Sequence, residues 1–376
     1  MDDLQNIRKE INSIDRELLK LFEKRMRCSI RVAEYKKENG IPIFNEEREK
    51  EILDRAEKDG GEFGYAARLL FSNIMELSRG IQHDIIGSGK KIRREIGEAE
   101  KDITSCSDTK IAVQGIEGAN SHEAAQKLFP NCRTIFYKSF SKVFEAVENE
   151  EADYGILPVE NSSAGSVSAV YDLILKYRFY IVKAIKLPIE HCLCGLKQSE
   201  FGDIEQVWSH PQALAQCSEF ISEYALKAVE CTNTAVAAKK IAEEKRLNCA
   251  AICSEKAADE YGLKVIAKGC QNYKDNSTRF IVISKQLIIP DNADKVSLCF
   301  SVPHTNGALY SVLGRFSSNG MNLTKLESRT IDGMPFEYLF YLDFQGNVQS
   351  DKVINMLCAL SEEMPEFSFL GNYKEV

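Results

Sequence analysis

The chain has 376 residues and a mass of 42.3 kDa, a length that predicts two or three domains, each able to bury its own core. Its 48 basic and 56 acidic residues give a net charge of −8 and an isoelectric point near 5.4, which argues against a broad binding surface for nucleic acid. The sequence has no run of about 18 apolar residues, so no membrane partner is expected. Its acidic start lacks the pattern of a signal peptide, which predicts a cytoplasmic protein.

The cysteines and histidines do not form recognisable ligand sets. The 12 cysteines are scattered singly, and the closest pairs, Cys192 with Cys194 and Cys249 with Cys253, do not make a CxxC motif. We therefore expect reduced, mostly buried thiols in place of a disulfide framework. The five histidines lack the spacing of metal ligands, so no metal site is expected.

Four regions differ in their residue patterns. Residues 1–87 read as helices, 88–108 as a charged linker, 109–287 as alternating strands and helices, and 293–376 as strand, helix, strand, strand, helix, strand. The predicted fold is therefore multidomain, with an all-α N-terminal domain, a two-lobed α/β middle domain and a ferredoxin-like α+β domain at the C-terminus.

The first predicted helix, from Asp2 to Asn39, contains no glycine or proline. Its apolar residues recur three and four apart, as in a coiled-coil seam: Leu4, Ile7, Ile11, Ile14, Leu18, Leu21, Cys28, Val32 and Tyr35. A helix longer than about 50 Å exceeds a small domain, so we expect an intertwined dimer. Arg25 stands in the seam where a hydrocarbon side chain is expected, and a desolvated guanidinium requires an anion. A plain helical dimerisation module with solvated cations is the alternative.

Seven further polar residues lie beside this seam or on the next two predicted helices: Arg8, Lys36, Asn45, Arg48, Glu49, Ser78 and Gln82. Together with Arg25 they resemble the all-helical chorismate mutase family over residues 4–85, although Asn45 stands where many relatives carry Asp. The family rearranges chorismate to prephenate in one pericyclic step, for which positioning and electrostatics suffice.

The resemblance also implies a role for each of these residues, and Asn45 would hydrogen-bond a hydroxyl of the substrate. Arg25 and the partner subunit's Arg8 would hold the two carboxylates of chorismate, with Arg48 in support. Lys36 and Gln82 would bind the ether oxygen, which gains negative charge as its bond to carbon breaks. Glu49 would bind the ring hydroxyl, and Ser78 would lie beside Gln82 in the site.

Hydroxyl and amide side chains gather at five junctions of the middle region, within residues 115–121, 160–166, 209–212, 232–234 and 254–255. Helix N-termini at such junctions bind small anions in α/β sheets, although each residue is also a good helix cap. The first junction lacks the spacing of a nucleotide-binding loop, so no nucleotide is expected. Thr278 differs from the others, because it leads into a strand and is not needed as a helix cap. It is the leading reactive candidate.

The segments QGIEGANSHEAA, LPVENSSAGSV, SHPQALAQC and NSTRFIVI resemble the prephenate dehydratase family, in the same order. The resemblance implies that carbon dioxide and water leave prephenate to give phenylpyruvate. Thr278 would donate a hydrogen bond to the departing hydroxyl, with five residues shaping the site, holding it together or binding a carboxylate: Asn161, Ser209, Gln216, Thr232 and Arg279. A buried, protonated Glu160 is the alternative acid, because a Thr hydroxyl is a weak one. His210 is expected to be structural.

The C-terminal region resembles an ACT domain of the phenylalanine-sensing kind. The resemblance is carried by Gly307-Ala308-Leu309 at the first helix and Glu327-Ser328-Arg329 on the second strand, with Thr330 where proline is often found. It implies L-phenylalanine as an effector, clasped between paired domains, that inhibits the enzyme. A plain dimerisation sheet is the alternative.

The three resemblances together imply a bifunctional enzyme of L-phenylalanine biosynthesis that needs no cofactor. We expect chorismate and prephenate as substrates and a homodimer or higher homo-oligomer. Two other functions stay open. One is a monofunctional prephenate dehydratase with a helical dimerisation domain, and the other is a non-catalytic sensor of a dicarboxylate or amino acid.

Overall fold

The computed structural model describes residues 2–305, 307–331 and 334–376. The chain divides into two compact units, one made of Met1–Glu98 with Ser297–Phe369 and the other of Ala99–Val296 with Leu370–Val376. The first unit therefore combines the N-terminal helices with most of the C-terminal region. Within the described part of the chain, no helix is long and apolar enough to cross a membrane.

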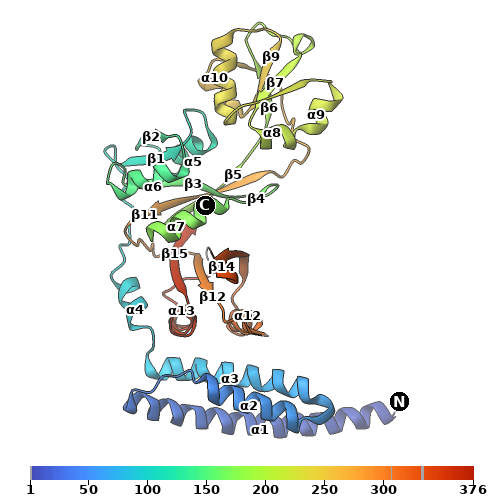
Figure 1. Ribbon diagram of the computed structural model, residues 1–376, viewed down its shortest axis with the longest axis vertical. Helices are drawn as coiled ribbons and strands as arrows, with labels where there is room; N and C mark the ends of the chain where they lie inside the picture. Colours follow the sequence, from blue (N-terminus) through green and yellow to red (C-terminus); the bar gives the residue numbers. More distant parts are fainter. Residues whose placement is uncertain (1, 306, 332–333) are drawn as a thin grey trace. The chain divides into compact units, whose positions relative to one another are not determined.

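Residues 2–86 of the first unit form three α-helices, α1 (Asp2–Asn39), α2 (Glu46–Asp59) and α3 (Gly64–Ile86). As predicted, α1 continues without a break until Gly40, whose positive φ of 62° ends it. Asn45 begins α2, because its Oδ1 accepts the backbone N–H of Arg48 at 2.9 Å. Helix α3 packs against both α1 and α2 (Figure 1).

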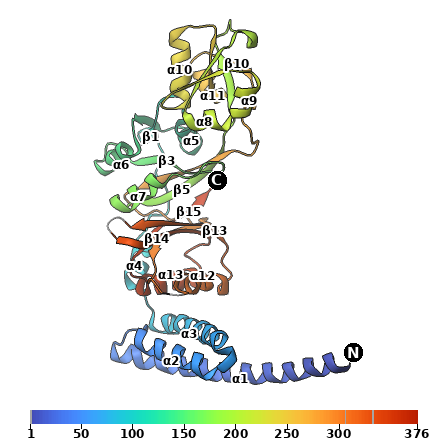
Figure 2. The same ribbon diagram turned by 45° about the vertical axis from the view of Figure 1, so that its right-hand side comes forward.

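The C-terminal region has the predicted order of elements: β12 (Lys295–Ser301), α12 (Ala308–Ser318), β13 (Leu323–Ile331), β14 (Met334–Gln345), α13 (Asp351–Glu363) and β15 (Phe367–Glu375). The strands lie in the order β13-β14-β12-β15. Helices α12 and α13 cover one face of this sheet (Figure 2). Strands β13 and β14 are antiparallel, with Glu327 opposite Tyr341.

Residues 88–108, which the sequence predicted to be a linker, contain the helix α4 (Lys90–Gly97). Gly87 and Gly89, with φ of 71° and 74°, turn the chain between α3 and α4. Helix α4 packs against α13 and buries Ile92. A helix is recognised in a sequence by apolar residues that recur every three or four positions. Of the eight residues of α4, only Ile92 is buried, so the sequence shows no such recurrence and did not predict this helix.

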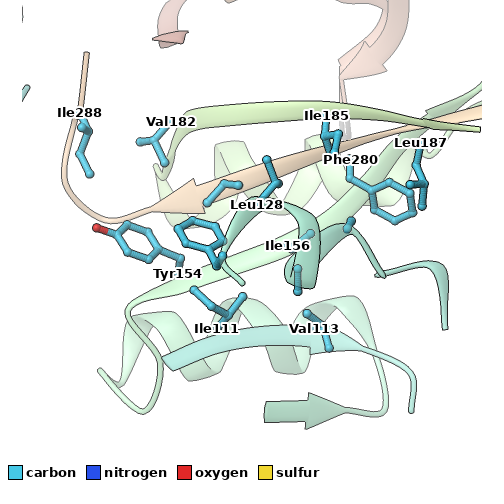
Figure 3. Packing of buried hydrophobic residues seen from close by; sticks show 14 of the residues in the cluster. Ile111, Val113, Leu128, Tyr154, Ile156, Val182, Ile185, Leu187, Phe280 and Ile288 are labelled. Atoms are coloured by element: carbon cyan, nitrogen blue, oxygen red, sulfur yellow. The ribbon is translucent and has the colours of Figure 1, made fainter. Parts of the chain in front are cut away.

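The second unit has two lobes. The strands of the first lobe are β1 (Lys110–Gln114), β2 (Arg133–Tyr137), β3 (Tyr154–Asn161), β4 (Gly165–Ser166), β5 (Tyr180–Pro188) and β11 (Ser277–Ser284), and its helices are α5 (Asn120–Leu128), α6 (Phe140–Glu148) and α7 (Ser168–Tyr177). The sheet order is β5-β11-β3-β1-β2, with β1, β2 and β3 parallel and β11 antiparallel to β3 and β5. Figure 3 shows part of the core, where side chains of β1, β3, β5 and β11 lie with Leu128 of α5.

The second lobe is inserted between β5 and β11. Its strands are β6 (Cys192–Gly195), β7 (Gln206–Ser209), β8 (Lys227–Glu230), β9 (Cys249–Cys253) and β10 (Lys264–Ala267), in the order β10-β6-β9-β7-β8. Its helices are α8 (Pro211–Gln216), α9 (Ser218–Glu223), α10 (Thr234–Glu244) and α11 (Glu255–Glu260). The two sheets agree with the predicted two-lobed α/β domain.

Candidate active sites

The first candidate site lies where α1 meets α3. Ser78 on α3 donates a hydrogen bond from Oγ to Oγ of Ser29 on α1, at 2.6 Å. Gln82, one turn further along α3, donates from Nε2 to the carbonyl of Ser78 at 3.3 Å. Both predicted residues are buried. Ser29 lies four residues after Arg25 on α1, so the helix contact brings the seam arginine beside this polar pair.

Three charged residues of the site influence one another. Burial lowers the pKa of Arg25, and the Glu49 carboxylate opposes this shift. Burial also lowers the pKa of Lys36, again opposed by Glu49. Lys36 donates from Nζ to the carbonyl of Ile43 at 2.5 Å, just before α2 begins. The predicted cations are therefore partly desolvated next to a single carboxylate.

Two buried polar atoms point to a ligand at this place. Nη1 of Arg25 and Oε1 of Gln82 have no hydrogen-bond partner among the residues that the structure describes. Because a buried polar group without a partner costs free energy, such atoms indicate a site that a polar molecule completes. The Arg25 guanidinium matches a carboxylate of such a molecule, and the Oε1 acceptor of Gln82 matches a hydrogen-bond donor.

Arg8, Asn45 and Arg48 are placed differently. Arg8 is exposed on α1, roughly 25 Å along the helix from Arg25 at 1.5 Å per residue, so one chain does not bring these two arginines together. Arg48 is exposed and paired with Glu51. The Asn45 side chain caps α2, which gives it a structural role in addition to the one predicted.

Sequence reasoning missed Arg79, a buried residue on α3 that pairs with Glu49. The helical pattern around it carried no signal for a second cation, because charged residues are common on helix faces. Only the packing of α3 against α2 brings Arg79 to the Glu49 carboxylate.

The second candidate site lies between β3 and β11. Thr278 and Asn161 are directly opposite in the register of the two strands. Asn161 donates from Nδ2 to Oγ1 of Thr278 at 2.9 Å, and its Oδ1 accepts the backbone N–H groups of Ser163 and Ala164 at 3.1 and 3.0 Å. These backbone donors fix which amide atom faces Thr278. Because Oγ1 accepts from Asn161, the Thr278 hydroxyl hydrogen is directed toward another acceptor.

Gln216 connects this site to the other lobe. It ends α8 and donates from Nε2 to Oγ of Ser163 at 2.6 Å. Its Oε1 lies 2.9 Å from Nε2 of His191 and 3.3 Å from Nδ2 of Asn276. Burial lowers the pKa of His191, and its hydrogen bond to Gln216 opposes this shift. A neutral imidazole that donates from Nε2 fits both observations.

Ser163, His191 and Asn276 were not predicted as site residues. Ser163 and Asn276 lie in the segments that carry the family motifs, yet the motifs alone did not separate them from helix caps. His191 lies outside those segments. Its role depends on the approach of α8, which the sequence pattern does not give.

Three residues that the sequence singled out in the second lobe do not join this hydrogen-bonded cluster. Ser209 is buried and donates to the carbonyl of Ile252 at 2.5 Å, which ties β7 to β9. His210 accepts the backbone N–H of Gln212 through Nδ1 and caps α8, so its predicted structural role is confirmed. Thr232 is exposed just before Asn233, the cap of α10.

Glu160 and Arg279 lie opposite each other in the register of β3 and β11. Successive strand residues point to opposite faces, so both side chains face away from Asn161 and Thr278. Arg279 pairs instead with Glu375 on β15 at 2.7 Å. Arg279 therefore helps to hold β11 and β15 together, and Glu160 stays the alternative acid of the dehydratase reaction.

The predicted effector residues lie on two elements of the C-terminal region. Gly307 has a φ of 81° and open space where a Cβ would stand, and Ala308 and Leu309 begin α12. On β13, Glu327 and Arg329 are half-buried on one face and Ser328 is exposed on the other. In the described residues, no group of three or more His, Cys, Asp or Glu side chains is arranged to hold a metal ion.

Known proteins match the chain over both candidate sites. The family model of chorismate mutase type II matches residues 7–83, and that of prephenate dehydratase matches residues 111–287. A bifunctional chorismate mutase/prephenate dehydratase of Buchnera aphidicola is 33% identical, over 99% of this chain and 96% of that protein. Arogenate dehydratase/prephenate dehydratase 2 of Arabidopsis thaliana is 39% identical, over 72% of this chain and 74% of its own length.

A solved structure is similar as well. The prephenate dehydratase from Arthrobacter aurescens in complex with L-Phe superimposes with a TM-score of 0.65 and 30% identity, covering 70% of this chain and 89% of that one. The regions that these proteins match are those in which the sequence motifs lie.

Proposed function

The chain belongs to the family of bifunctional chorismate mutases/prephenate dehydratases, and from this premise we propose how its residues divide the two reactions. The enzyme rearranges chorismate to prephenate and converts prephenate to phenylpyruvate. The predicted pairing of the two enzymes in one chain is confirmed. The mutase residues belong to α1, α2 and α3, and the dehydratase residues belong to the two lobes of the second unit.

In the mutase reaction, the enzyme holds chorismate in the compact conformer in which the breaking and forming bonds can react together. Arg25 binds one carboxylate and the partner subunit's Arg8 binds the other, with Arg48 in support. Lys36 donates a hydrogen bond to the ether oxygen, and Gln82 donates a second one with the Nε2 hydrogen that it does not give to the Ser78 carbonyl. Glu49 accepts a hydrogen bond from the ring hydroxyl. The buried Nη1 of Arg25, which lacks a partner in the described part of the chain, is the observation that carries this proposal.

The role of Arg8 requires a second copy of the chain. The apolar stripe of α1 is exposed, with Leu4, Ile7, Ile11, Ile14 and Leu18 each at least 49% accessible. A contiguous apolar stripe along a 38-residue helix is a surface that another helix covers. A second α1 running in the opposite direction would bury this stripe and bring one Arg8 to the other subunit's Arg25.

In the dehydratase reaction, the ring carboxylate of prephenate leaves as carbon dioxide and its bonding electrons complete the aromatic ring. The hydroxyl group on the ring carbon opposite the one that carries this carboxylate leaves and takes up a proton to become water. Thr278 donates a hydrogen bond to this oxygen as negative charge grows on it. Asn161 orients the Thr278 hydroxyl for that donation. Gln216 of the other lobe holds Asn161 through a hydrogen bond of 3.3 Å from its Nε2 to Oδ1 of Asn161.

The C-terminal βαββαβ region is an ACT domain that binds L-phenylalanine and lowers the dehydratase activity. The related Arthrobacter aurescens enzyme was solved in complex with L-Phe, which supports this proposal. Gly307 leaves room for a ligand near the start of α12. The carboxylate of Glu327 and the guanidinium of Arg329, on one face of β13, match the opposite charges of a free amino acid.

Product analysis of the purified chain tests these assignments. Chorismate and prephenate are supplied separately, and prephenate and phenylpyruvate are quantified with and without L-phenylalanine. Arg25→Ala should abolish prephenate formation and leave dehydration intact, whereas Thr278→Ala should do the reverse. Arg27→Ala, an exposed change on the same helix, and Thr278→Ser, which keeps the hydroxyl, are the matched controls. Full dehydratase turnover in Thr278→Ala, or no response to L-phenylalanine, would contradict the corresponding assignment.

A further inference from the structure

A cluster of buried ionisable residues, which neither reaction uses directly, joins α3 to α12 and α13 within the first unit. Its members are Glu76, Arg79, His83, Arg315 and Glu363. Each side chain is at most 11% exposed. Burying a charge is costly unless opposite charges surround it, so this arrangement requires that the two helices of the C-terminal region remain packed on α3.

Arg79 lies at the centre of the cluster and contacts three carboxylates. Its Nη2 pairs with Glu76, its Nε lies 3.2 Å from Oε2 of Glu363, and its Nη1 pairs with Oε2 of Glu49. Burial alone would lower the pKa of Arg79, but the three carboxylates raise it, so the group stays cationic. Glu49 belongs to the candidate mutase site, whereas Glu363 belongs to α13.

Glu363 is held in turn by the C-terminal region. Its Oε1 lies 2.6 Å from Nε2 of His83, and its Oε2 pairs with Arg315 of α12. Ser311, one turn before Arg315, donates from Oγ to Glu76 at 2.8 Å. Both helices of the C-terminal region thus fix the guanidinium of Arg79, and Arg79 fixes Glu49.

We propose that Arg79 is a positioning residue of the mutase site. It holds the Glu49 carboxylate for the ring hydroxyl of chorismate and is itself held by Glu363 of the C-terminal region. This inference rests on the role proposed for Glu49. Arg79 meets Glu49 through Oε2, so the substrate hydroxyl approaches the carboxylate from Oε1. Mutase activity therefore depends on how the C-terminal region is packed on α3.

A double-mutant cycle on the full chain tests the proposal. Arg79→Gln should lower mutase kcat/KM by about tenfold, the effect of one lost charged hydrogen bond. The loss should appear mainly as a higher KM, because Glu49 binds the hydroxyl in ground state and transition state alike. Glu49→Gln should show the same division between KM and kcat. The variant with both changes should be no worse than Glu49→Gln alone.

Arg68→Gln is the matched control, because Arg68 lies on the same helix and pairs with Asp54 and Glu57 of α2. It should leave mutase kinetics unchanged. Dehydratase activity of each preparation and its circular dichroism report whether the chain has folded, and Arg79→Lys should recover part of the loss. Glu363→Gln should raise the mutase KM in the same direction as Arg79→Gln.

The outcomes separate the two claims. A Glu49→Gln variant with unchanged mutase kinetics would refute the role of Glu49 itself. Impaired Glu49→Gln together with normal Arg79→Gln would refute the positioning role alone. Additive losses in the double variant would show that Arg79 acts independently of Glu49, which also overturns the proposal. A normal Glu363→Gln variant would remove the dependence on the C-terminal region.

Discussion

At the scale of single residues, Lys36 and Lys37 are neighbours on α1 with different surroundings. Burial lowers the pKa of Lys36 beside Glu49, whereas Lys37 is exposed and donates to the carbonyl of Ile85. A cation aimed at the ether oxygen matters most when that oxygen becomes negative, so Lys36→Ala should lower mutase kcat by about 100-fold or more and raise KM far less. Steady-state kinetics with chorismate measure both constants.

Lys37→Ala provides the comparison for that result. It removes an equal charge from the same turn of helix and should change neither constant by more than about twofold, because an exposed charge is well screened by solvent. Equal kcat values for Lys36→Ala and wild type would show that another group stabilises the ether oxygen.

The sequence predicted some residues of each site better than others. Thr278 and Asn161 could be predicted because they stand in motifs and adopt a strand pairing that the α/β pattern allows. Glu160 stands in the same motif, next to Asn161 on β3, and successive residues of a strand point to opposite faces, so the motif alone does not tell which of the two side chains lies beside Thr278. His191 and Arg79 could not be predicted, because each acquires its partner through the packing of separate elements.

At the scale of elements, the exposed stripe on α1 determines whether the mutase site is complete. Ile14 is 50% exposed in the middle of the stripe. Ile14→Glu would bury a charge in the proposed interface between the two α1 helices. The free-energy cost of burying that charge exceeds what the remaining apolar contacts around position 14 contribute. We expect loss of the dimer contact through α1 and loss of mutase activity, because Arg8 no longer reaches the other subunit. Light scattering with size-exclusion chromatography and the chorismate assay measure the two effects.

Lys20→Glu is the control for Ile14→Glu, since position 20 is exposed on another side of α1. It introduces the same acid without touching the stripe, so assembly and mutase activity should stay as in wild type. Dehydratase activity should survive in both variants. Full mutase activity in a monomeric Ile14→Glu variant would show that each chain carries a complete site.

Two glycines between α3 and α4 test how closely α4 is packed. Gly87 and Gly89 both have positive φ, so alanine at either position costs about 1 kcal/mol of backbone strain. A Cβ on Gly89 would also collide with Cys358 of α13, whereas one on Gly87 meets nothing within 4 Å. Gly89→Ala should therefore lower the melting temperature clearly more than Gly87→Ala, because overpacking adds about 1–3 kcal/mol. Equal shifts in differential scanning calorimetry would contradict this packing.

The elements themselves were largely predictable where local signals were strong. The absence of glycine and proline predicted α1, and the alternation of strands and helices predicted the order of the C-terminal region. Helix α4 was not predicted, because its charged sequence resembles a linker and a single buried residue, Ile92, does not produce a helical repeat of apolar residues. Such a short helix is stabilised by its packing on α13 and not by its own sequence pattern.

At the scale of the whole molecule, the sequence predicted the helices and the βαββαβ region as separate domains, and the structure places both in one unit. Glu76 and Arg79 on α3, and Arg315 and Glu363 on α12 and α13, are ordinary helix-surface charges when each helix is considered alone. They become buried only when the helices meet. Charge complementarity between regions more than 200 residues apart along the chain has no local pattern, so this part of the architecture could not be predicted.

The same cluster predicts how the first unit responds to acid. Burial by itself would raise the pKa of Glu363, but His83, Arg315 and Arg79 lower it from 4.5 to about 2. Below about pH 4.5, Glu363 is therefore protonated less in the folded state than in the unfolded chain. The stabilisation, of about 3 kcal/mol for a shift of this size, is complete above that pH and is lost as the pH falls toward 2.

Glu363→Gln removes this charge and tests the prediction, because an amide resembles the protonated carboxyl group. Wild type should melt at a higher temperature than Glu363→Gln at pH 6, and the gap should narrow steadily between pH 4.5 and the lowest pH at which the chain still folds. Glu57→Gln, which affects a half-exposed partner of Arg68, should melt close to wild type across this range. The difference in melting temperature between wild type and Glu363→Gln could also stay constant below pH 4.5. That result would mean that the cluster does not stabilise the ionised form of Glu363, because an ion-paired carboxylate loses its stabilising effect when it binds a proton.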